Sequence, residues 1–499
     1  MSETKDTQIK PVWRNIWLTK LKERRSVILP ILSVLLVITI LLLVLPHVLP
    51  MPSLVATSKG IGVSHDKDGE DIGLSDGSYA LDVEKDKQDI EKYRPGSDYK
   101  TQASDAFRRG DASTATALWK EALRVDSNDA ETKIYLEDQQ VVTSGKPYVT
   151  IVLGSVLSNK PVDYPSRDQL QGAYIAQLEH NQSVRTAGGL LLRLLIAKSG
   201  NTPINSIAVA NRIVEAAKSD KTIIGVFGWT KTTSSLDVLP ILTRAHLPLL
   251  ASTAPGDDLT GRSPYFFRVT PTNKEQASVL AKYAETKLKL QKLVAVYEEQ
   301  DPFSQNFVDD FTQQFVTGGH QAPARLTYER LSTPEKMAQT VQSVLQMNAD
   351  SVLLIGSRST DIANFLRAIP DNSHMKILTN AGQYAIVNAP LGEYRNTQGL
   401  IFVSPGFLDS WTIIKPSVQA PSFFSAYKRQ FDPNDLHKNA PYGYQRPDAY
   451  TMLAYDAVLT FLKGIQIAST THKESMTGDD LQQALLKING AQAVQGVTG

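Results

Sequence analysis

From residue 148 onward, short apolar runs alternate with longer segments in which apolar residues recur every three or four positions. The first pattern predicts buried strands and the second predicts amphipathic helices. Strands are expected at 148–153, 191–197, 222–227, 248–251, 265–269, 294–297, 351–355 and 376–379, and helices at 167–181, 204–217, 233–245, 306–317 and 360–367. Because parallel strands need crossover connections, which these helices can supply, the order predicts an α/β fold of the doubly wound, Rossmann-like type.

Two stretches of this region resemble a known family in residue identity as well as in the order of elements. They are IIGVFGWTKTTSSLDVLPILTRAHLPLLASTAPGDDLTGRSPYFFRVTPTNKEQASVLAKYA, which begins at Ile223, and KLVAVYEEQDPFSQNFVDDFTQQF, which begins at Lys292. They are similar to the type I periplasmic-binding family of branched-chain amino-acid-binding proteins and receptor ligand-binding regions, and the likeness covers 148–499. It implies two lobes with a central cleft, joined by strands that cross near 267–272 and 400–404. Lobe one would comprise 148–268 and 405–495, and lobe two 270–399.

Ligands of open α/β sheets bind beyond the carboxyl ends of the strands, so residues that follow strands are the candidates for contact with a ligand. In lobe one we expect these to be Trp229, Thr232, Thr233, Ser252, Thr253 and Ala254. The hydroxyls and free N–H groups at the start of the helix near Thr233 suit an anionic group. The alternative is an ordinary helix cap by Thr232 or Thr233, and a simple turn at 251–254.

In lobe two the expected ligand residues are Phe303, Ser357, Arg358 and Gln383. By resemblance, Phe303 takes the place of an aromatic ring that closes over the ligand, although it could equally belong to the core. Arg358 could clamp a carboxylate or be solvated. The segment 379–383 lacks the acidic residue with which amino-acid-binding relatives pair the ligand's ammonium. This absence favours a neutral or anionic solute, unless Gln383 or Asp301 substitutes.

The run from Val27 to Leu45 contains no charged residue and, at about 1.5 Å per residue, nearly matches a hydrocarbon core of about 30 Å. Lysine and arginine are frequent before it and rare in the residues after it. We therefore expect a cytoplasmic tail at 1–26, a single membrane helix within 27–48 and an extracytoplasmic remainder, with an uncleaved anchor favoured over a cleaved signal peptide.

Residues 51–97 are rich in Asp, Glu, Lys, Gly and Ser, a composition typical of a flexible linker. Residues 98–145 then show helical spacing that resembles a single tetratricopeptide repeat. Because one repeat cannot bury its faces alone, a helical neck packed beside the main domain is favoured over a peptide-binding groove.

The composition and the motif search favour binding over catalysis. Lysine and arginine total 52 against 51 aspartate and glutamate, so no global charge attracts nucleic acid. There is no cysteine for a disulfide, thiolate metal site or lipid anchor, and the eight histidines are scattered without ligand spacing. Because GxSxG, HExxH, P-loop and GxGxxG motifs are also missing, we expect no enzyme activity, no cofactor and no metal.

These expectations combine into a membrane-anchored extracytoplasmic protein that captures a small polar ligand, such as an amino acid or amide, for ABC-type uptake or for sensing. Its partners would be that ligand, the membrane and either a transporter permease or a sensor. The alternative is a protein-interaction module of the cell envelope that uses the same fold without a solute. Relatives continue beyond a segment like 494–499 into a further strand, so we expect either an exposed sheet edge or tolerance of its loss.

Overall fold

The computed structural model describes 59–67, 69–83, 94–157, 164–200, 202–371, 373–384, 386, 399–413, 418–438, 442–470 and 475–499. The chain divides into two units, Met1–Val55 and Ala56–Gly499, and everything described belongs to the second. The predicted tail at 1–26 and membrane helix within 27–48 therefore lie outside the described residues. In the part that is described, no helix has the combination of length and apolar character that crossing a bilayer requires.

The sheet of lobe one has seven strands in the order β1-β2-β4-β3-β5-β6-β7. Their bounds are β1 Gly62–His65, β2 Asp71–Ser75, β3 Tyr148–Ser155, β4 Leu191–Lys198, β5 Ile223–Gly228, β6 Leu249–Ala251 and β7 Phe266–Arg268. Strands β3 to β7 pair in parallel, whereas β2 pairs antiparallel with both β1 and β4. The long parallel register runs from Tyr148 opposite Leu191 to Ser155 opposite Lys198.

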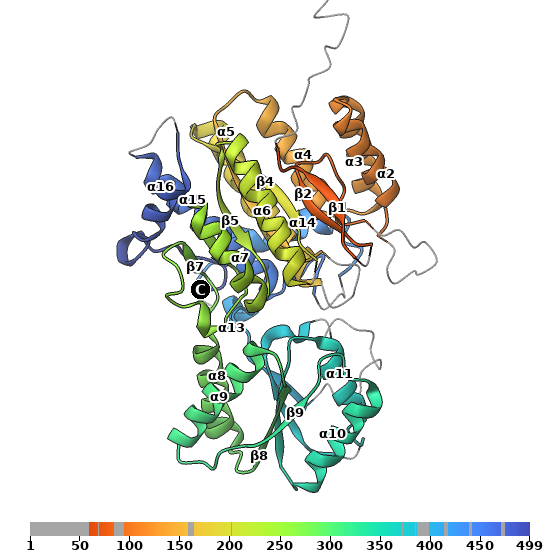
Figure 1. The fold of residues 1–499 in the computed structure, drawn as a ribbon, viewed down its shortest axis with the longest axis vertical. Coiled ribbons are helices and arrows are strands. Elements are labelled where there is room, and N and C mark those ends of the chain that lie inside the picture. Colours follow the sequence, from red (N-terminus) through yellow and green to blue (C-terminus); the bar gives the residue numbers. More distant parts are fainter. Residues whose placement is uncertain are drawn as a thin grey trace, which may run out of the picture. The chain divides into compact units, whose positions relative to one another are not determined.

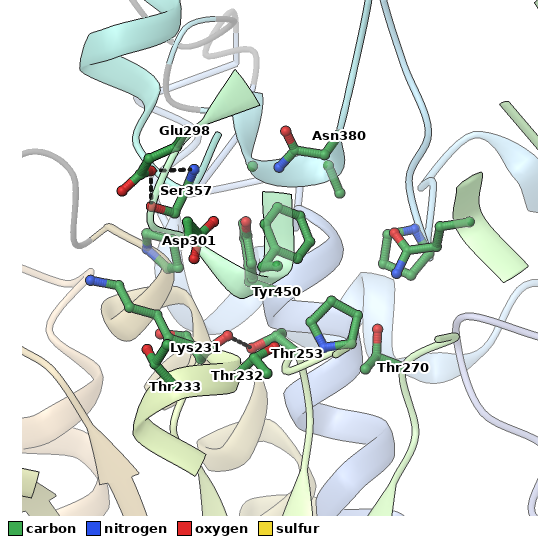
Figure 2. A pocket seen from close by; sticks show the side chains of 18 of the residues that line it. Lys231, Thr232, Thr233, Thr253, Thr270, Glu298, Asp301, Ser357, Asn380 and Tyr450 are labelled. Atoms are coloured by element: carbon green, nitrogen blue, oxygen red, sulfur yellow. Dashed lines mark hydrogen bonds between the residues drawn. The ribbon is translucent and has the colours of Figure 1, made fainter. Parts of the chain in front are cut away.

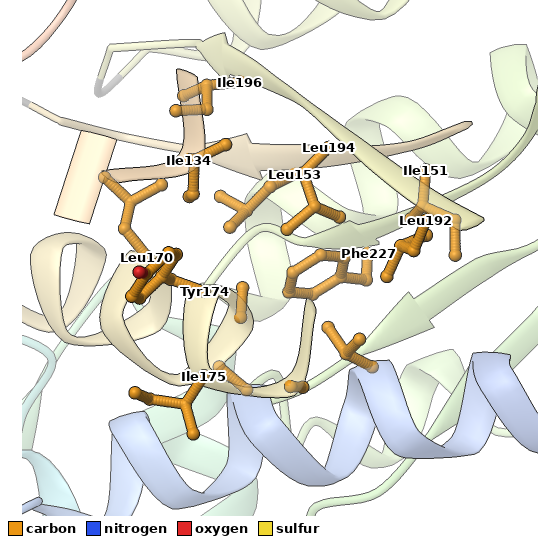
Figure 3. Close-up of a cluster of buried hydrophobic side chains, with 14 of the residues drawn as sticks. Ile134, Ile151, Leu153, Leu170, Tyr174, Ile175, Leu192, Leu194, Ile196 and Phe227 are labelled. Atoms are coloured by element: carbon orange, nitrogen blue, oxygen red, sulfur yellow. The ribbon is translucent and has the colours of Figure 1, made fainter. Parts of the chain in front are cut away.

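Helices cover both faces of this sheet because successive strand residues point to opposite sides. Ile151 and Leu153 of β3 face one core, whereas Val152 faces the other. Figure 3 shows the first core, where β3, β4 and Phe227 meet helix α5. The helices of this lobe are α5 Tyr164–Ala187, α6 Pro203–Ser219, α7 Thr232–Arg244, α13 Ser410–Ile413, α14 Ser422–Phe431, α15 Ala449–Ser469 and α16 Gly478–Leu485, with short turns at η2 Asp257–Leu259 and η6 Gly490–Gln492.

Lobe two is a wholly parallel five-stranded sheet with the order β12-β11-β10-β8-β9 (Figure 1). Its strands are β8 Leu293–Glu298, β9 Ala324–Tyr328, β10 Ser351–Ile355, β11 Lys376–Thr379 and β12 Leu400–Phe402. Its helices are α8 Asn273–Tyr283, η3 Ala284–Leu288, α9 Pro302–Thr317, α10 Pro334–Gln346, α11 Ser359–Ala368 and η4 Ala381–Gln383. Helices α8 and α9 enclose one core, and α10 and α11 enclose the other.

The predicted α/β class with two sheets is confirmed, and the chain passes twice between them. After β7 it runs through 269–272 into α8, and after β12 it runs through 403–409 into α13. Each crossing therefore follows directly on a strand at the edge of its sheet.

The expectation of a flexible linker over 51–97 is wrong for residues 62–82. Strands β1 and β2 extend the main sheet, and Ile72 and Leu74 are buried in its core. Several of the charged residues that the structure describes in this stretch lie in the β1–β2 turn or in ion pairs. Asp82, for example, binds Arg94 at 3.1 Å and Arg167 at 2.9 Å. Residues 84–93 lie outside the described part of the chain.

Three helices follow where helical spacing predicted a neck, and they pack on lobe one. They are α2 Ser97–Arg108, α3 Ala112–Val125 and α4 Ala130–Thr143. Trp119 is fully buried between Phe107 and Tyr135, with ring centroids 5.6 and 5.8 Å away. Helix α4 contacts α5 and β4, so these helices share the core of lobe one.

Candidate ligand-binding cleft

A cavity of about 540 Å³ lies where the carboxyl ends of both sheets meet, and it is called the cleft below. Lobe one contributes the start of α5, the β5–α7 loop, the segment after β6 and the start of α15. Lobe two contributes the residues that follow β8, β9, β10 and β11. Thr270 and Pro405, from the two crossing segments, also line it. Parallel strands bring their polar ends to one edge, and the two lobes place those edges face to face.

The lobe-one wall presents hydroxyl groups around the start of α7. Thr232, Thr233 and Thr253 all line the cleft (Figure 2). The Thr232 Oγ1 accepts a hydrogen bond of 3.1 Å from the Gly256 amide, which fixes this side chain. The N-cap position is Lys231, and no side chain caps the helix. The first turn of α7 therefore directs backbone donors and the positive end of the helix dipole toward the cleft.

The lobe-two wall is acidic. Glu298 is the last residue of β8, and its carboxylate accepts a hydrogen bond of 2.7 Å from the Ser357 hydroxyl. Asp301 caps α9 by accepting from the Ser304 amide at 3.1 Å and from its hydroxyl. Burial, together with the nearby charge of Glu298, raises the pKa of Asp301 above its usual range.

Asn380 and Tyr450 complete the visible walls (Figure 2). The Asn380 oxygen faces the amide of Gly356 at 3.5 Å. Tyr450 lies in the first turn of α15, and burial raises the pKa of its hydroxyl, so that it stays protonated and can donate or accept a hydrogen bond at neutral pH.

Five of the predicted ligand residues line the cleft: Thr232, Thr233, Thr253, Phe303 and Ser357. Phe303 lies in the first turn of α9, half-buried, with its ring 6.0 Å from that of Phe307. The structure therefore brings together the hydroxyl-bearing residues of lobe one and the aromatic residue of lobe two. The helix cap that we considered for Thr232 and Thr233 is not what α7 uses.

Trp229 was expected in the cleft but is fully buried in the core of lobe one. Its backbone has a positive φ of 50°, and its amide donates to the Gly154 carbonyl at 2.7 Å. The indole packs so closely on Gly154 that a Cβ there would lie 2.6 Å from the ring. The turn after β5 therefore directs this side chain into the core and leaves the following threonines for the cleft.

The other predicted residues, Ser252, Ala254, Arg358 and Gln383, also do not line the cleft. Ser252 is buried and accepts a hydrogen bond of 2.6 Å from Gln169, and Ala254 is part of the core. Arg358 lies 3.7 Å from Asp361 and is the N-cap residue of α11. Gln383 is fully buried, and neither polar atom of its amide has a hydrogen-bond partner in the described part of the chain.

Sequence reasoning missed several cleft residues, of which Glu298 is the most important; the others include Lys231, Thr270, Asn380 and Tyr450. A signal for Glu298 was present, because a glutamate ends the apolar run LVAVYE of β8. A carboxylate at the end of a buried parallel strand lies where ligands bind. The cleft therefore has a carboxylate at the end of β8, although the segment 379–383 has none.

Comparison with known proteins agrees with this geometry. The family model described as periplasmic binding protein matches residues 166–498, which is more than half of the chain. The chain belongs to the periplasmic binding protein family. This is a family of binding proteins and not of enzymes. No curated protein matches the chain.

Solved structures of other periplasmic binding proteins share its fold. A leucine binding protein from Thermotoga maritima is 18% identical with a TM-score of 0.57, and a branched-chain amino acid transporter substrate binding protein from Streptococcus pneumoniae, in complex with isoleucine, is 17% identical with a TM-score of 0.57. Both matches cover 70% of this chain and 90% of the other. A solute binding protein of an ABC transporter from R. palustris, in complex with 4-hydroxybenzoate, is 16% identical with a TM-score of 0.50, covering 68% of this chain and 84% of the other.

Proposed function

We propose that this chain captures a small polar solute in the cleft by closing its two lobes around it. The observation that carries the proposal is the cleft itself, a cavity of about 540 Å³ with polar groups from both lobes on its walls. This volume falls within the range of roughly 300–1,000 Å³ that small-molecule sites occupy. The two crossing segments contribute Thr270 and Pro405 to the walls, so a hinge motion there would change the cleft directly.

The two walls differ in chemistry, and this difference suggests how a solute would be oriented. The uncapped start of α7, with Thr232 and Thr233, suits a carboxylate. Glu298 and Asp301 on the opposite wall suit an ammonium group. An amino-acid-like solute would satisfy both walls. The structure supports this class more strongly than the sequence did, because the sequence showed no carboxylate at 379–383.

The ligands of related proteins are consistent with the lobe-one assignment. Isoleucine and 4-hydroxybenzoate, bound by two of the structural relatives, both carry a carboxylate. We further propose that the chain delivers its solute to an ABC-type permease or reports it to a sensor, as a protein anchored to the membrane through 27–48. An open, polar cleft favours solute capture over the alternative of a protein-interaction module, which would tolerate a filled cleft.

A ligand screen by thermal unfolding tests the proposal. The full chain, purified in a mild detergent, is unfolded in the presence of amino acids, amides, sugars and organic acids. A solute at a hundred times its dissociation constant adds about 2.7 kcal/mol to the free energy of unfolding and raises the midpoint. If no solute in the panel raises the midpoint, the protein-interaction alternative becomes the better account.

A matched pair of threonine variants then tests the cleft. Thr233→Val removes a cleft hydroxyl while retaining a branched side chain, and we expect the solute's affinity to fall about tenfold because a hydrogen bond to a charged group is lost. Thr340→Val changes a partly buried threonine on α10, outside the cleft, and leaves the affinity unchanged. Equal affinities for both variants would place the solute elsewhere.

A further inference from the structure

The charge on the cleft walls points to the class of solute. Glu298, Glu299, Asp301 and Glu329 line the cleft, whereas Lys231 and Arg330 are its basic lining residues. Lys336 pairs with Glu329 at 2.7 Å from outside the cleft. Even when this lysine is counted, the carboxylates outnumber the cations. The walls therefore create a negative potential in a confined space, where field lines concentrate.

Glu298 is the most deeply buried of these four carboxylates. Its side chain is 3% exposed, and its ion-pair partner, Arg330, lies 3.7 Å away and is itself 48% exposed. A buried carboxylate with one distant, solvated partner carries a large desolvation cost that a second, closer cation would offset. The hydrogen bond from Ser357 holds the carboxylate in place without neutralising it.

Asp301 adds a second carboxylate near the first. It is fixed by its hydrogen bonds to Ser304 at the start of α9. A single ammonium group balances only one of these two charges. Glu299, next along the loop, is exposed and lines the same cleft, so a longer solute could reach a third carboxylate.

We propose, on the basis of the solute-binding function proposed above, that the solute carries a net positive charge, with a carboxylate at the start of α7 and two cationic groups on the acidic wall of lobe two. Basic amino acids such as lysine and arginine have this chemistry. One cation pairs with Glu298 and Asp301, and the second lies toward Glu299 and Glu329. Neutral amino acids of similar size offer no second cation to the outer carboxylates and bind more weakly.

Calorimetric titration of the full chain in detergent compares L-lysine, L-arginine, L-leucine and L-glutamate. We expect lysine or arginine to bind at least tenfold more tightly than leucine, and glutamate to bind most weakly. Raising the sodium chloride concentration should weaken lysine binding more than leucine binding, because screening acts on the net charge of the solute. Tighter binding of leucine or glutamate would overturn the cationic assignment while retaining solute capture. If none of these solutes binds while an amide or sugar does, the assignment also fails and solute capture still stands.

Three variants separate the two cationic positions. Glu298→Gln should weaken lysine and leucine alike by about tenfold or more, since both carry the first ammonium. Glu299→Gln combined with Glu329→Gln should weaken lysine and leave leucine unchanged. Glu335→Gln, an exposed change on α10 outside the cleft, serves as the control and leaves both affinities unchanged. If the double variant binds lysine as tightly as the unaltered chain, the second cationic position does not exist.

Discussion

At the scale of single residues, Asp138 of α4 shows how burial sets a pH dependence. One of its oxygens accepts hydrogen bonds from Gln177 at 2.7 Å and from the Leu194 amide at 3.0 Å, while the other has no partner among the described residues. Burial outweighs these bonds and the attraction of Arg193 and raises the pKa of Asp138 to about 8. The protonated form is therefore the form that the folded state prefers at neutral pH.

This pKa predicts that stability falls as pH rises. Between the usual pKa of an aspartate and about 8, the folded state holds a proton that the unfolded state has released, so the contribution is full at low pH and is lost toward pH 8. We expect Asp138→Asn to remove this dependence and to raise the free energy of unfolding at pH 8.5 by roughly 2–5 kcal/mol. Urea unfolding at pH 5.5 and pH 8.5 measures this free energy for the unaltered chain and for the variant. A variant with the same pH slope as the unaltered chain would contradict the assignment.

Single residues also show which parts of the cleft could be predicted from the sequence. Thr232, Thr233 and Thr253 were found because position after a strand is readable from the pattern of apolar runs. The prediction that Trp229 lines the cleft was wrong. A left-handed turn and the space over Gly154 decide the direction of its side chain, and neither can be recognised from the order of residues. Glu298 was missed because the family resemblance places the acidic residue at 379–383, whereas this carboxylate stands at the end of β8.

At the scale of elements, the N-terminal segment is tied to lobe one by buried ion pairs. Lys100 of α2 is completely buried and lies 2.8 Å from both Asp129 and Glu131. Glu131 also accepts hydrogen bonds from the amides of Leu81 and Asp82, which holds the chain after β2. Burial disfavours the charged form of Lys100, but the combined attraction of these carboxylates is larger and raises the pKa of Lys100. The cluster therefore joins β2, α2 and α4 as one unit.

Removing the charge of Lys100 should lower the stability of the fold. Lys100→Met leaves two buried carboxylates without their close cation, and we expect a loss of roughly 3–5 kcal/mol in the free energy of unfolding, measured with urea. Lys120→Met, at an exposed position on α3, is the control and changes stability by less than about 0.5 kcal/mol. A loss below about 1 kcal/mol for Lys100→Met would show that the cluster does not stabilise the lobe.

Elements that bury one regular apolar face were predictable, and the expected strands at 148–153, 191–197 and 351–355 agree with β3, β4 and β10 within two residues. Strands β1 and β2 were missed because they are short and their neighbours are charged. Burial of Ile72 and Leu74 depends on the main sheet, and pairing of Asp82 depends on Arg94 and on Arg167 of α5. Both are long-range effects that local composition cannot show.

At the scale of the whole solute-binding unit, the two lobes also meet outside the cleft. Helix α9 of lobe two packs against α7 of lobe one. Asp310 of α9 shares a hydrogen bond with Asp257, which follows β6 in lobe one. Burial and this carboxylate raise the pKa of Asp310 to about 7, although Lys274 lowers it and Asp309, itself paired with Arg325, raises it further. While Asp310 carries a proton, its hydrogen bond to Asp257 joins the two lobes, and this bond is lost when the proton dissociates.

Lobe separation should therefore depend on pH. In an open form Asp310 would have an ordinary pKa, so the proton stabilises the closed contact at low pH, and this stabilisation is lost as pH rises through about 7 because two carboxylates then repel. The chain has no cysteine, so Lys218→Cys on α6 and Glu335→Cys on α10 allow spin labels on opposite lobes. We expect the distance between the labels to lengthen between pH 5.5 and pH 8.5.

Two variants of α9 test which group controls this change. Asp310→Asn keeps a neutral donor at both pH values and should hold the short distance. Asp309→Asn, on the same helix and paired with Arg325, should retain the pH response. A pH response that persists in Asp310→Asn would mean that another group controls the contact between the lobes.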